Sequence, residues 1–392
     1  MYITSAGNNG HYIFDPGSEE LDAKKTGSDR WLLVSVIMLM MAGLLAVYSS
    51  IAYFAETHLV PASSLVGNHI IKIGISFLVM IIFSKVDYHL FARYSKMALI
   101  LSWVFLVIVS LYGTEVFGAR RSLDVGMFSF QPSSLATVAL LIHLCVLITR
   151  KQENIKDLKT GFLPLMIWVT VTCGLIGLED FSSAAVLMGL SLLIMFVGRV
   201  STWHISAIVM VGILGAGALL MQSPERQSRV SNYVEQVVHI NSDGLVQEAG
   251  YQAQQAQIAV AQGQLFGVGM GKSSQRDFLP APYNDFIYAI ITEEYGLIGA
   301  IFILGLYVVI LFRGLVFIAR RAVDETGVLL AVAATLMVTL YGFVNAAVAT
   351  GLFPVTGLPM PFVSYGGTSM LFTGMMIGVL LNISKQQRGG AA

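Results

Sequence analysis

The sequence predicts an all-α fold: a polytopic membrane protein with ten transmembrane helices and a long extracytoplasmic loop between the seventh and the eighth. Of its 392 residues, 56% are hydrophobic and only 12% are charged, about half the charged fraction of a soluble domain. Apolar runs close to the roughly 17–25 residues needed to cross a bilayer recur along the chain. Lys and Arg gather in alternate connections between these runs, as the positive-inside rule requires.

We expect these apolar runs to be helical, because hydrocarbon offers no hydrogen-bond partner to an open backbone. The sixth run is the shortest. In order, the runs are 31–53, 68–84, 96–112, 133–149, 162–178, 183–198, 205–221, 286–312, 328–350 and 367–383.

Most of the 23 Lys and Arg residues fall in connections that share a side with the N-terminus, which predicts that both termini are cytoplasmic. The chain then divides into a polar tail (1–30), a transmembrane domain (31–384) and a short cytoplasmic tail (385–392). The extracytoplasmic loop covers 222–285. The first tail has no apolar core, so we expect no cleaved signal peptide.

Composition also narrows the function. The net charge is zero, which argues against a nucleic-acid partner. Cys145 and Cys173 lie in apolar runs and are predicted to be core residues, not a disulfide or a metal pair. His69 and His143 are likewise expected to pack in the core. We predict no metal site, and the need for a divalent cation stays open.

The two predicted outer loops, 113–132 and 222–285, hold cations that depart from the positive-inside rule. Within the longer loop, residues 225–240 and 251–265 show helical patterns. The alanines and Ile258 of the second pattern favour a helix that lies on the membrane surface.

Asp285 follows two prolines and Asn284, where the long loop enters the eighth run. A carboxylate so close to hydrocarbon is costly and is therefore a functional-site hypothesis. Two interpretations stay open: Asp285 caps the helix, or it is a general base whose pKa is raised by partial burial. Glu293 and Glu294 lie two turns further on, and at least one of them is expected to face a cavity or to pair with a cation.

Several cations are candidates for binding an anion. The glycine-rich segment 267–274 is not a P-loop, because Phe266 occupies the position of the first glycine. The segment is either a turn or a backbone that approaches a phosphate, assisted by Lys272 and Arg276. Arg120 and Arg121 are either interfacial residues or a bidentate clamp for a diphosphate.

Two other segments carry local structural signals. Glu179 and Asp180 are predicted to form a cap and turn before the sixth run. Residues 351–367 are rich in proline and glycine. They predict a broken or re-entrant segment, which a membrane protein tolerates where it lines a cavity or is buried in protein.

Four stretches together resemble the SEDS family (shape, elongation, division and sporulation) of integral membrane peptidoglycan polymerases. The resemblance spans the chain after its N-terminal tail and is closer to FtsW, the cell-division branch, than to RodA. The matching stretches are GARR at 118–121 with FQPSSLA at 130–136, residues 257–299, GLFPVTGLPMPFVSYGGTSML at 351–371 and, more weakly, LEDFSSA at 178–184.

The resemblance implies an inverting peptidoglycan glycosyltransferase in the bacterial cytoplasmic membrane, at the division septum. Its substrate would be lipid II, a disaccharide-pentapeptide on undecaprenyl diphosphate. Asp285 matches the family's essential aspartate and would take the proton from the attacking sugar hydroxyl. The residues expected to bind lipid II are Arg120, Arg121, Lys272, Arg276, Gln131 and Ser364, with Asp180, Glu293 and Glu294 as possible supporting residues.

The expected partners are a class B penicillin-binding transpeptidase, other division membrane proteins and membrane lipid. This chain departs from the family pattern at Ser134 and Thr137, where the family has a membrane-buried Glu and Lys. Loss of both partners leaves no unpaired charge. Ser122 and Glu179 also depart, in place of a Trp and a Pro, and leave open a weakly active or partner-dependent protein.

Two other functions stay open. Many spans and a broken helix also suit a lipid II transporter that works by alternating access. Alternatively, the protein is a division scaffold that binds the transpeptidase without polymerising. Production of glycan strands from pure lipid II separates the three.

Overall fold

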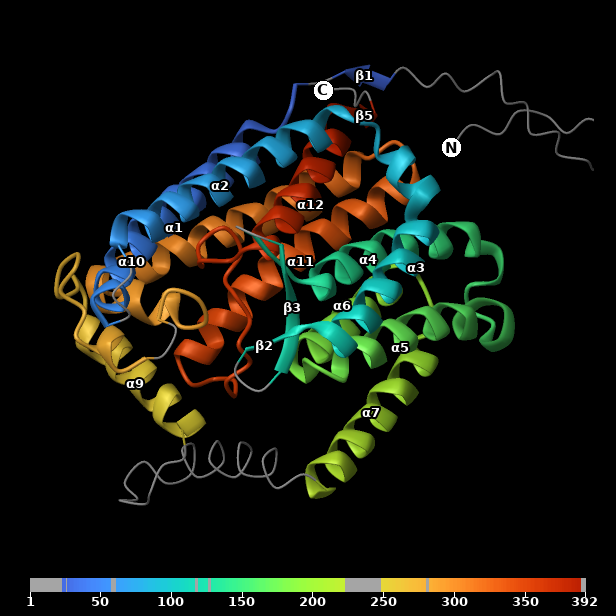
Figure 1. Cartoon of the computed structure of the whole chain (residues 1–392). Coiled ribbons are helices and arrows are strands. Elements are labelled where there is room, and N and C mark those ends of the chain that lie inside the picture. Colours follow the sequence, from blue (N-terminus) through green and yellow to red (C-terminus); the bar gives the residue numbers. More distant parts are fainter. Residues whose placement is uncertain are drawn as a thin grey trace, which may run out of the picture.

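We describe a computed structural model of the chain that covers residues 23–25, 27–57, 61–116, 119–125, 128–222, 248–279 and 282–388. The predicted helix at 225–240 lies outside the described residues. The helices, shown in Figure 1, are α1 (Arg30–Thr57), α2 (Ala62–Lys85), α3 (Tyr88–Tyr112), α4 (Pro132–Arg150), α5 (Leu163–Gly177), α6 (Phe181–Val197), α7 (Thr202–Gln222), α9 (Glu248–Gly263), α10 (Ile287–Phe312), α11 (Glu325–Ala349) and α12 (Thr368–Lys385).

Every one of the ten predicted runs coincides with a helix. In the described part of the chain, eight helical segments are long and apolar enough to cross a membrane. Helix α6 and the first part of α7 are shorter apolar helices. The prediction of an all-α polytopic membrane fold is therefore confirmed, whereas the count of ten spans stays a prediction.

Helix ends differ from the apolar runs because hydropathy marks contact with lipid, whereas capping marks where a helix begins. Helix α3 begins at Tyr88, well before the apolar run that opens at residue 96. Its N-cap is Asp87, whose carboxylate accepts a hydrogen bond from the His89 amide at 3.0 Å. The polar first turns of this helix thus precede its membrane-facing part.

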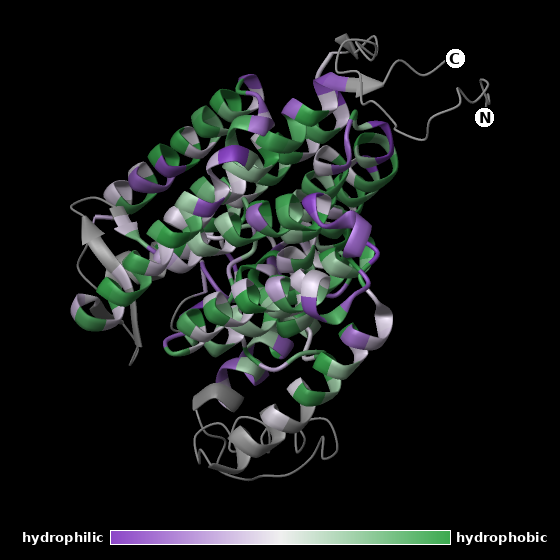
Figure 2. Ribbon diagram, turned by 90° about the vertical axis from the view of Figure 1, so that its right-hand side faces the viewer, coloured by the Kyte–Doolittle hydropathy of each residue, from purple (hydrophilic) through white to green (hydrophobic). Residues whose placement is uncertain are grey.

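The outer surface of the bundle is apolar. Figure 2 shows that hydrophobic residues predominate along the helices. Large hydrophobic side chains are exposed, among them Trp203 (80%) and Met97 (69%). Such a surface would not persist in water, but it matches lipid chains. The hydrophobic effect therefore acts here through lipid contact as well as through the core.

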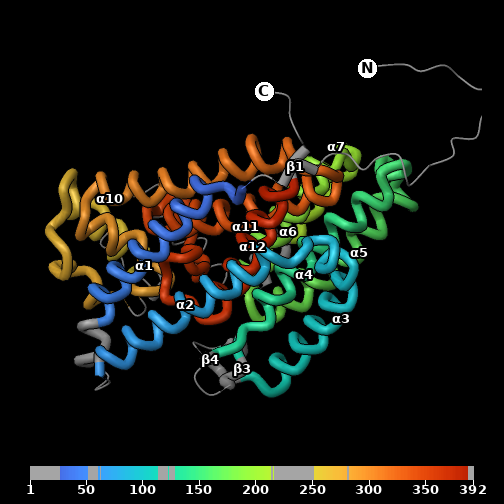
Figure 3. The backbone as a smooth tube through the Cα atoms, turned by 90° about the horizontal axis from the view of Figure 1, so that it is seen from above, coloured from blue at the N-terminus to red at the C-terminus, as the bar shows by residue number. Residues whose placement is uncertain are grey.

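Helices α4, α11 and α12 form the centre of the bundle, since they are the most buried spans. Helix α2 packs on α12, α3 on α4 and α1 on α10, and Figure 3 shows α1 and α10 along one edge. A Cβ added to Gly374 or Gly378 of α12 would lie within 2.7 Å of backbone oxygens in α2. These small residues allow the close approach of the two helices.

Both tails of the described chain meet on one side of the bundle (Figure 1). Strand β1 (Ala23–Lys25) pairs with β5 (Gln386–Arg388) in antiparallel register. Nearby, Asp29 accepts from Arg313 through two nitrogens, which ties the start of α1 to the end of α10. Two tails on one side agree with an even number of spans, and their cytoplasmic location stays a prediction.

The first outer loop is folded as a small sheet, which the all-α prediction missed. It consists of β2 (Thr114–Val116), β3 (Ala119–Val125) and β4 (Phe128–Phe130), in the order β2-β3-β4. Glu115 is opposite Arg120 in the register of β2 and β3. Strands β2 and β4 have three residues each, which is too short to show the alternation on which a sequence-based prediction depends.

Helix α10 is broken at Gly296, and the glycine-rich loop before it fills the break. Gly296 has φ 68°, a left-handed conformation inside the helix. The freed carbonyls of Glu293 and Glu294 accept from the amides of Val268 (2.9 Å) and Gly269 (3.0 Å). The freed Leu297 amide donates to Gln264 at 2.9 Å. The break therefore leaves these backbone groups paired.

Helix α9 confirms the helix predicted at 251–265. Its apolar face, expected to lie on the membrane surface, packs on other helices instead. Ala253, Ala256 and Ala259 are buried, and α9 packs on α10 and α11. The alanine face that suggested contact with the membrane surface is thus covered by protein. Alanine permits the close approach that a larger side chain would prevent.

We predict that Gly296→Ala destabilises the protein strongly. A Cβ there would overlap the backbone of Leu265 and Gly267, and an alanine at φ 68° and ψ −167°, a region essentially reserved for glycine, costs about 1–3 kcal/mol by itself. The measurement is thermal unfolding of the purified protein in detergent. Gly305→Ala, in the same helix with nothing within 4 Å of the new Cβ, is the control. Equal unfolding temperatures for the two variants would contradict the proposed packing of the loop.

Candidate functional site

Asp285 lies on a turn, residues 282–286, that is held by the non-helical segment between α11 and α12. The Tyr365 amide donates to the Tyr283 carbonyl at 2.9 Å. The Ser364 hydroxyl donates to the Asn284 carbonyl at 2.6 Å. Asn345 of α11 donates from Nδ2 to the Asp285 carbonyl at 2.9 Å and to the Leu358 carbonyl at 2.8 Å.

These contacts position the Asp285 backbone without using its carboxylate. The side chain is half-buried, and its Oδ2 lies beside Gly357, where an added Cβ would be 3.6 Å away. The N-cap of α10 is Phe286, so Asp285 does not hold the cap position that one interpretation gave it. What remains is a carboxylate on a rigid turn at the entrance of an apolar helix.

Two tyrosines flank this turn and connect it to α2. The rings of Tyr283 and Tyr365 meet edge to face at 5.5 Å, and the Lys72 ammonium lies 3.9 Å from the Tyr365 ring centroid. His69 also stacks on the Tyr365 ring, with the two ring centroids 5.3 Å apart. Burial raises the pKa of Tyr283, and interactions with Tyr365 and Asp285 raise it further. Tyr283 therefore keeps its proton at neutral pH.

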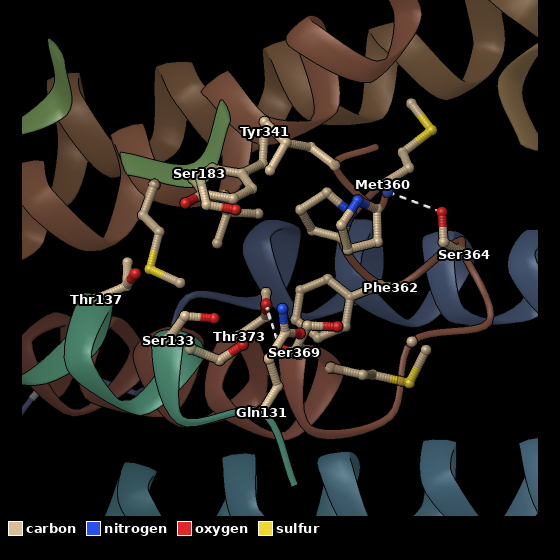
Figure 4. Close-up of a pocket in the computed structure, with 18 residues that line it drawn as sticks. Gln131, Ser133, Thr137, Ser183, Tyr341, Met360, Phe362, Ser364, Ser369 and Thr373 are labelled. Atoms are coloured by element: carbon tan, nitrogen blue, oxygen red, sulfur yellow. Dashed lines mark hydrogen bonds between the residues drawn. The ribbon is translucent and has the colours of Figure 1, made fainter. Parts of the chain in front are cut away.

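A cavity of about 60 Å³, lined by hydroxyl groups and by apolar side chains, lies beside the turn, among α4, α6, α11, α12 and the segment 350–367. Figure 4 shows hydroxyls of Ser133, Ser369 and Thr373 among its labelled side chains. Gln131 and Ser364, both predicted to bind substrate, line it, whereas Asp285 does not. Residues of the broken segment 351–367 line this cavity, which confirms one of the two places predicted for that segment. Its size suits a few water molecules rather than a sugar.

The cavity contains no charged side chain among its lining residues. Ser134 and Thr137, which occupy the positions of the family's Glu and Lys, both line it. Tyr341 of α11 lines the cavity as well. A neutral hydroxyl pair therefore occupies this place.

Asp180 has a structural partner that the sequence predicted. It is the N-cap of α6 and accepts from the Ser183 amide at 3.1 Å and from the Ser183 hydroxyl at 2.8 Å. Glu179 accepts from Ser110 at 3.0 Å. The cap interpretation of Asp180 is confirmed, and Ser183 lines the cavity, so the cap also fixes one wall of the site.

Glu293 and Glu294 are fully buried, and the charge of Arg276 beside Glu294 agrees with the expectation that at least one of them pairs with a cation. They bind the glycine-rich loop. Glu293 accepts from the Ser274 amide at 2.9 Å and from the Ser273 hydroxyl. Glu294 accepts from the Gly271 amide at 3.1 Å and from the Ser49 hydroxyl of α1. Arg276 adds a favourable charge interaction with Glu294.

The loop amides are thus used within the protein. Three glycines of the loop have positive φ: Gly267, Gly269 and Gly271. The loop precedes α10 in the chain and lies along its break. Four of the loop's amides donate hydrogen bonds to Glu293 or Glu294. The segment is a shaped turn, and these amides do not form a phosphate cradle.

The four cations predicted to bind a diphosphate differ in their exposure and in their contacts. Lys272 is exposed. Arg276 is half-buried and donates from Nη1 to the Ser49 carbonyl at 3.0 Å, so it ties the loop to α1. Arg120 and Arg121 lie on β3, but their side chains lie outside the described part of the structure. Binding of a diphosphate by these four residues stays a prediction.

Sequence reasoning missed Lys72, Asn345 and Tyr283. For Lys72 a signal existed, because a single lysine inside an apolar run is a candidate functional residue by its cost alone. Asn345 lies in another apolar run, and its partners are 13 and 60 residues away. Among the described residues no group of three or more His, Cys, Asp or Glu side chains could hold a metal ion.

The fold and the site define a class: an all-α polytopic membrane protein with a carboxylate on a turn that is held by a non-helical segment between two helices. The chain matches the family model described as cell cycle protein, FTSW_RODA_SPOVE, over residues 30–389. It belongs to this family of FtsW, RodA and SpoVE proteins.

Curated relatives cover nearly the whole chain. Stage V sporulation protein E of Bacillus subtilis is 34% identical over 376 residues, which are 94% of this chain and 100% of that protein. The probable peptidoglycan glycosyltransferase FtsW of Coxiella burnetii is 31% identical over 366 residues, covering 91% and 96%.

Solved structures share the fold. The rod shape determining protein RodA of Thermus thermophilus has a TM-score of 0.67 at 22% identity, covering 93% of this chain and 98% of that chain. A chain from a peptidoglycan synthase complex has a TM-score of 0.71 at 22% identity, covering 93% and 99%. At this identity the similarity establishes the fold alone.

We predict that Asn345→Leu lowers both stability and activity, because two buried carbonyls lose their donor at about 1–3 kcal/mol each. Asn382→Leu is the matched control. Asn382 is a buried asparagine that donates to the Ser84 carbonyl and accepts from the Tyr88 amide, both at 3.2 Å, at the other end of the bundle.

The measurements are thermal unfolding and polymerisation of lipid II well below the unfolding temperature. We expect similar stability losses in the two variants, with loss of activity only for Asn345→Leu. If Asn345→Leu and Asn382→Leu are equally folded and equally active, Asn345 does not position the Asp285 turn.

Proposed function

We propose that this chain is an inverting peptidoglycan glycosyltransferase that joins lipid II units into glycan strands at the outer face of the bacterial cytoplasmic membrane. The observation that carries the proposal is the position of Asp285: a carboxylate on a turn that is held by three separate contacts to its backbone carbonyls, beside a cavity lined in part by hydroxyl groups. Membership of the FtsW, RodA and SpoVE family supports it.

In this proposal Asp285 accepts the proton of the acceptor sugar's 4-hydroxyl as that oxygen attacks the anomeric carbon of the donor. The bond to the lipid diphosphate breaks, and the diphosphate leaves with its electron pair. Inversion follows from attack opposite the leaving group. A base must lie within hydrogen-bond reach of the proton that it removes, which a turn fixed by its backbone provides.

Cations would stabilise the diphosphate as its charge develops. Lys272 and Arg276 on the glycine-rich loop and Arg120 and Arg121 on β3 are the candidates from sequence. We add Lys72, whose ammonium lies over Tyr365, the residue that hydrogen-bonds to the Asp285 turn. The cavity beside the turn is small, so we propose that the sugars react at the Asp285 turn and that water binds to the hydroxyl groups of the cavity.

We further propose that the protein acts during septal wall synthesis, with both termini in the cytoplasm and a class B penicillin-binding transpeptidase as partner. The similar solved chain comes from a complex described as coordinating polymerisation and crosslinking. A sporulation role is a second candidate, because stage V sporulation protein E is 34% identical over 94% of this chain.

The decisive variant is Asp285→Asn, which keeps the shape of the side chain but removes its basicity. We expect loss of at least 100-fold in polymerisation of lipid II by the purified protein with its transpeptidase, in line with the usual contribution of a general base. Glu153→Gln is the control, an equal charge change at an exposed position. Both variants must unfold at the wild-type temperature.

Activity of Asp285→Asn equal to wild type would remove Asp285 from the mechanism. If neither protein makes strands while the transpeptidase complex is intact, a translocation assay with labelled lipid II comes next. Movement of lipid II would favour the transporter, and its absence would favour the scaffold.

Lys72 supplies an independent test. We expect Lys72→Gln to raise KM for lipid II about tenfold, the effect of one charge-assisted contact. Lys72→Arg should preserve KM, since Arg also stacks on aromatic rings and binds phosphate. Steady-state kinetics on both variants give the answer. If KM is unchanged in Lys72→Gln, the lysine only packs on Tyr365.

A further inference from the structure

A second cavity, of about 320 Å³, opens between the ends of α3, α4 and α5. Gln131 precedes α4 at the first cavity, and Arg150 ends α4 at the second. The nineteen-residue helix α4 separates the two by about 28 Å. The second cavity therefore lies at the opposite end of the bundle from the Asp285 turn, on the side predicted to be cytoplasmic.

Four cations line this cavity: Arg93, Lys96, Arg150 and Lys151. No Asp or Glu lines it. Among the described residues the ion pairs do not involve any of the four. Lys151 donates to the Thr160 carbonyl at 2.7 Å. A group of like charges without a counter-charge repels itself and attracts an anion.

The floor of the cavity offers a polar atom that the protein does not use. His143 is only 5% exposed, and its Nδ1 lies 3.1 Å from the Ser95 hydroxyl. Its Nε2 has no hydrogen-bond partner within the described part of the chain. A buried ring nitrogen without a partner is uncommon, and here it belongs to a residue that lines a cavity with a basic mouth.

The walls are apolar and lead to the lipid-facing surface. Trp168, Leu147 and Pro164 form part of them, and Lys96 lies 5.9 Å from the Trp168 ring. On the adjoining surfaces of α3 and α5, Met97 is 69% exposed and Ile167 is 54% exposed. A ligand that fits has an anionic head and apolar chains.

We propose that this cavity binds the phosphate headgroup of an anionic phospholipid, with its acyl chains along α3 and α5. Basic pockets between transmembrane helices are known to bind such headgroups. A free phosphate would satisfy the same cations, but it would not use the apolar surfaces beside them. The proposal does not rest on the glycosyltransferase function.

The test compares the full-length wild type with Arg93→Gln/Arg150→Gln, two exposed positions. Arg320→Gln/Arg321→Gln, which removes two equally exposed cations elsewhere, is the matched control. Native mass spectrometry measures the phosphatidylglycerol retained from vesicles with equal phosphatidylcholine. We expect about a 20-fold loss of affinity in the first variant, or roughly fivefold for each cation, and little change in the control.

Equal losses in the two variants would overturn the proposal, since only the overall surface charge would then matter. Equal retention of phosphatidylcholine and phosphatidylglycerol by the wild type would also overturn it. In a third arm, millimolar inorganic phosphate is added: displacement of the lipid would identify the site as one for free phosphate and overturn the lipid assignment. Retention of the lipid supports it.

Discussion

Backbone groups at membrane depth must find their hydrogen bonds inside the protein, and the half of this molecule that contains Asp285 depends on that requirement. Non-helical stretches at 264–279, 282–286 and 350–367 are tolerated because they pair with each other and with the break in α10. Asp285 is held by this pairing. Its carbonyl and those of its two predecessors accept hydrogen bonds, which leaves the position of the carboxylate to the backbone.

The parts of the fold that depend on local chemistry could be predicted. Apolar runs located ten helices, and proline and glycine marked the segment at 351–367. A costly charge marked Asp285. Contacts between distant parts of the chain could not be predicted: Glu294 meets Ser49, 245 residues away, and no local pattern encodes that pair. The same holds for Arg276, whose partner is the Ser49 carbonyl, and for the short strands of the first outer loop.

The two ends of α4 illustrate how one helix serves two environments. Its first turn, after Gln131, faces hydroxyls and amides around a small neutral cavity. Its last turn, at Arg150, joins a basic opening beside lipid-facing helices. The middle of the helix is almost entirely buried. A change in the tilt of α4 would therefore move the residues at both of its ends.

The neutral cavity has a consequence for how the protein responds to an energised membrane. A buried charge that moves across the bilayer exchanges about 2.3 kcal/mol with each 100 mV of potential. Ser134, Thr137 and Tyr341 carry no charge in this cavity. Rearrangements of the cavity wall are therefore insensitive to the membrane potential. We expect this cavity to behave alike in energised cells and in de-energised vesicles.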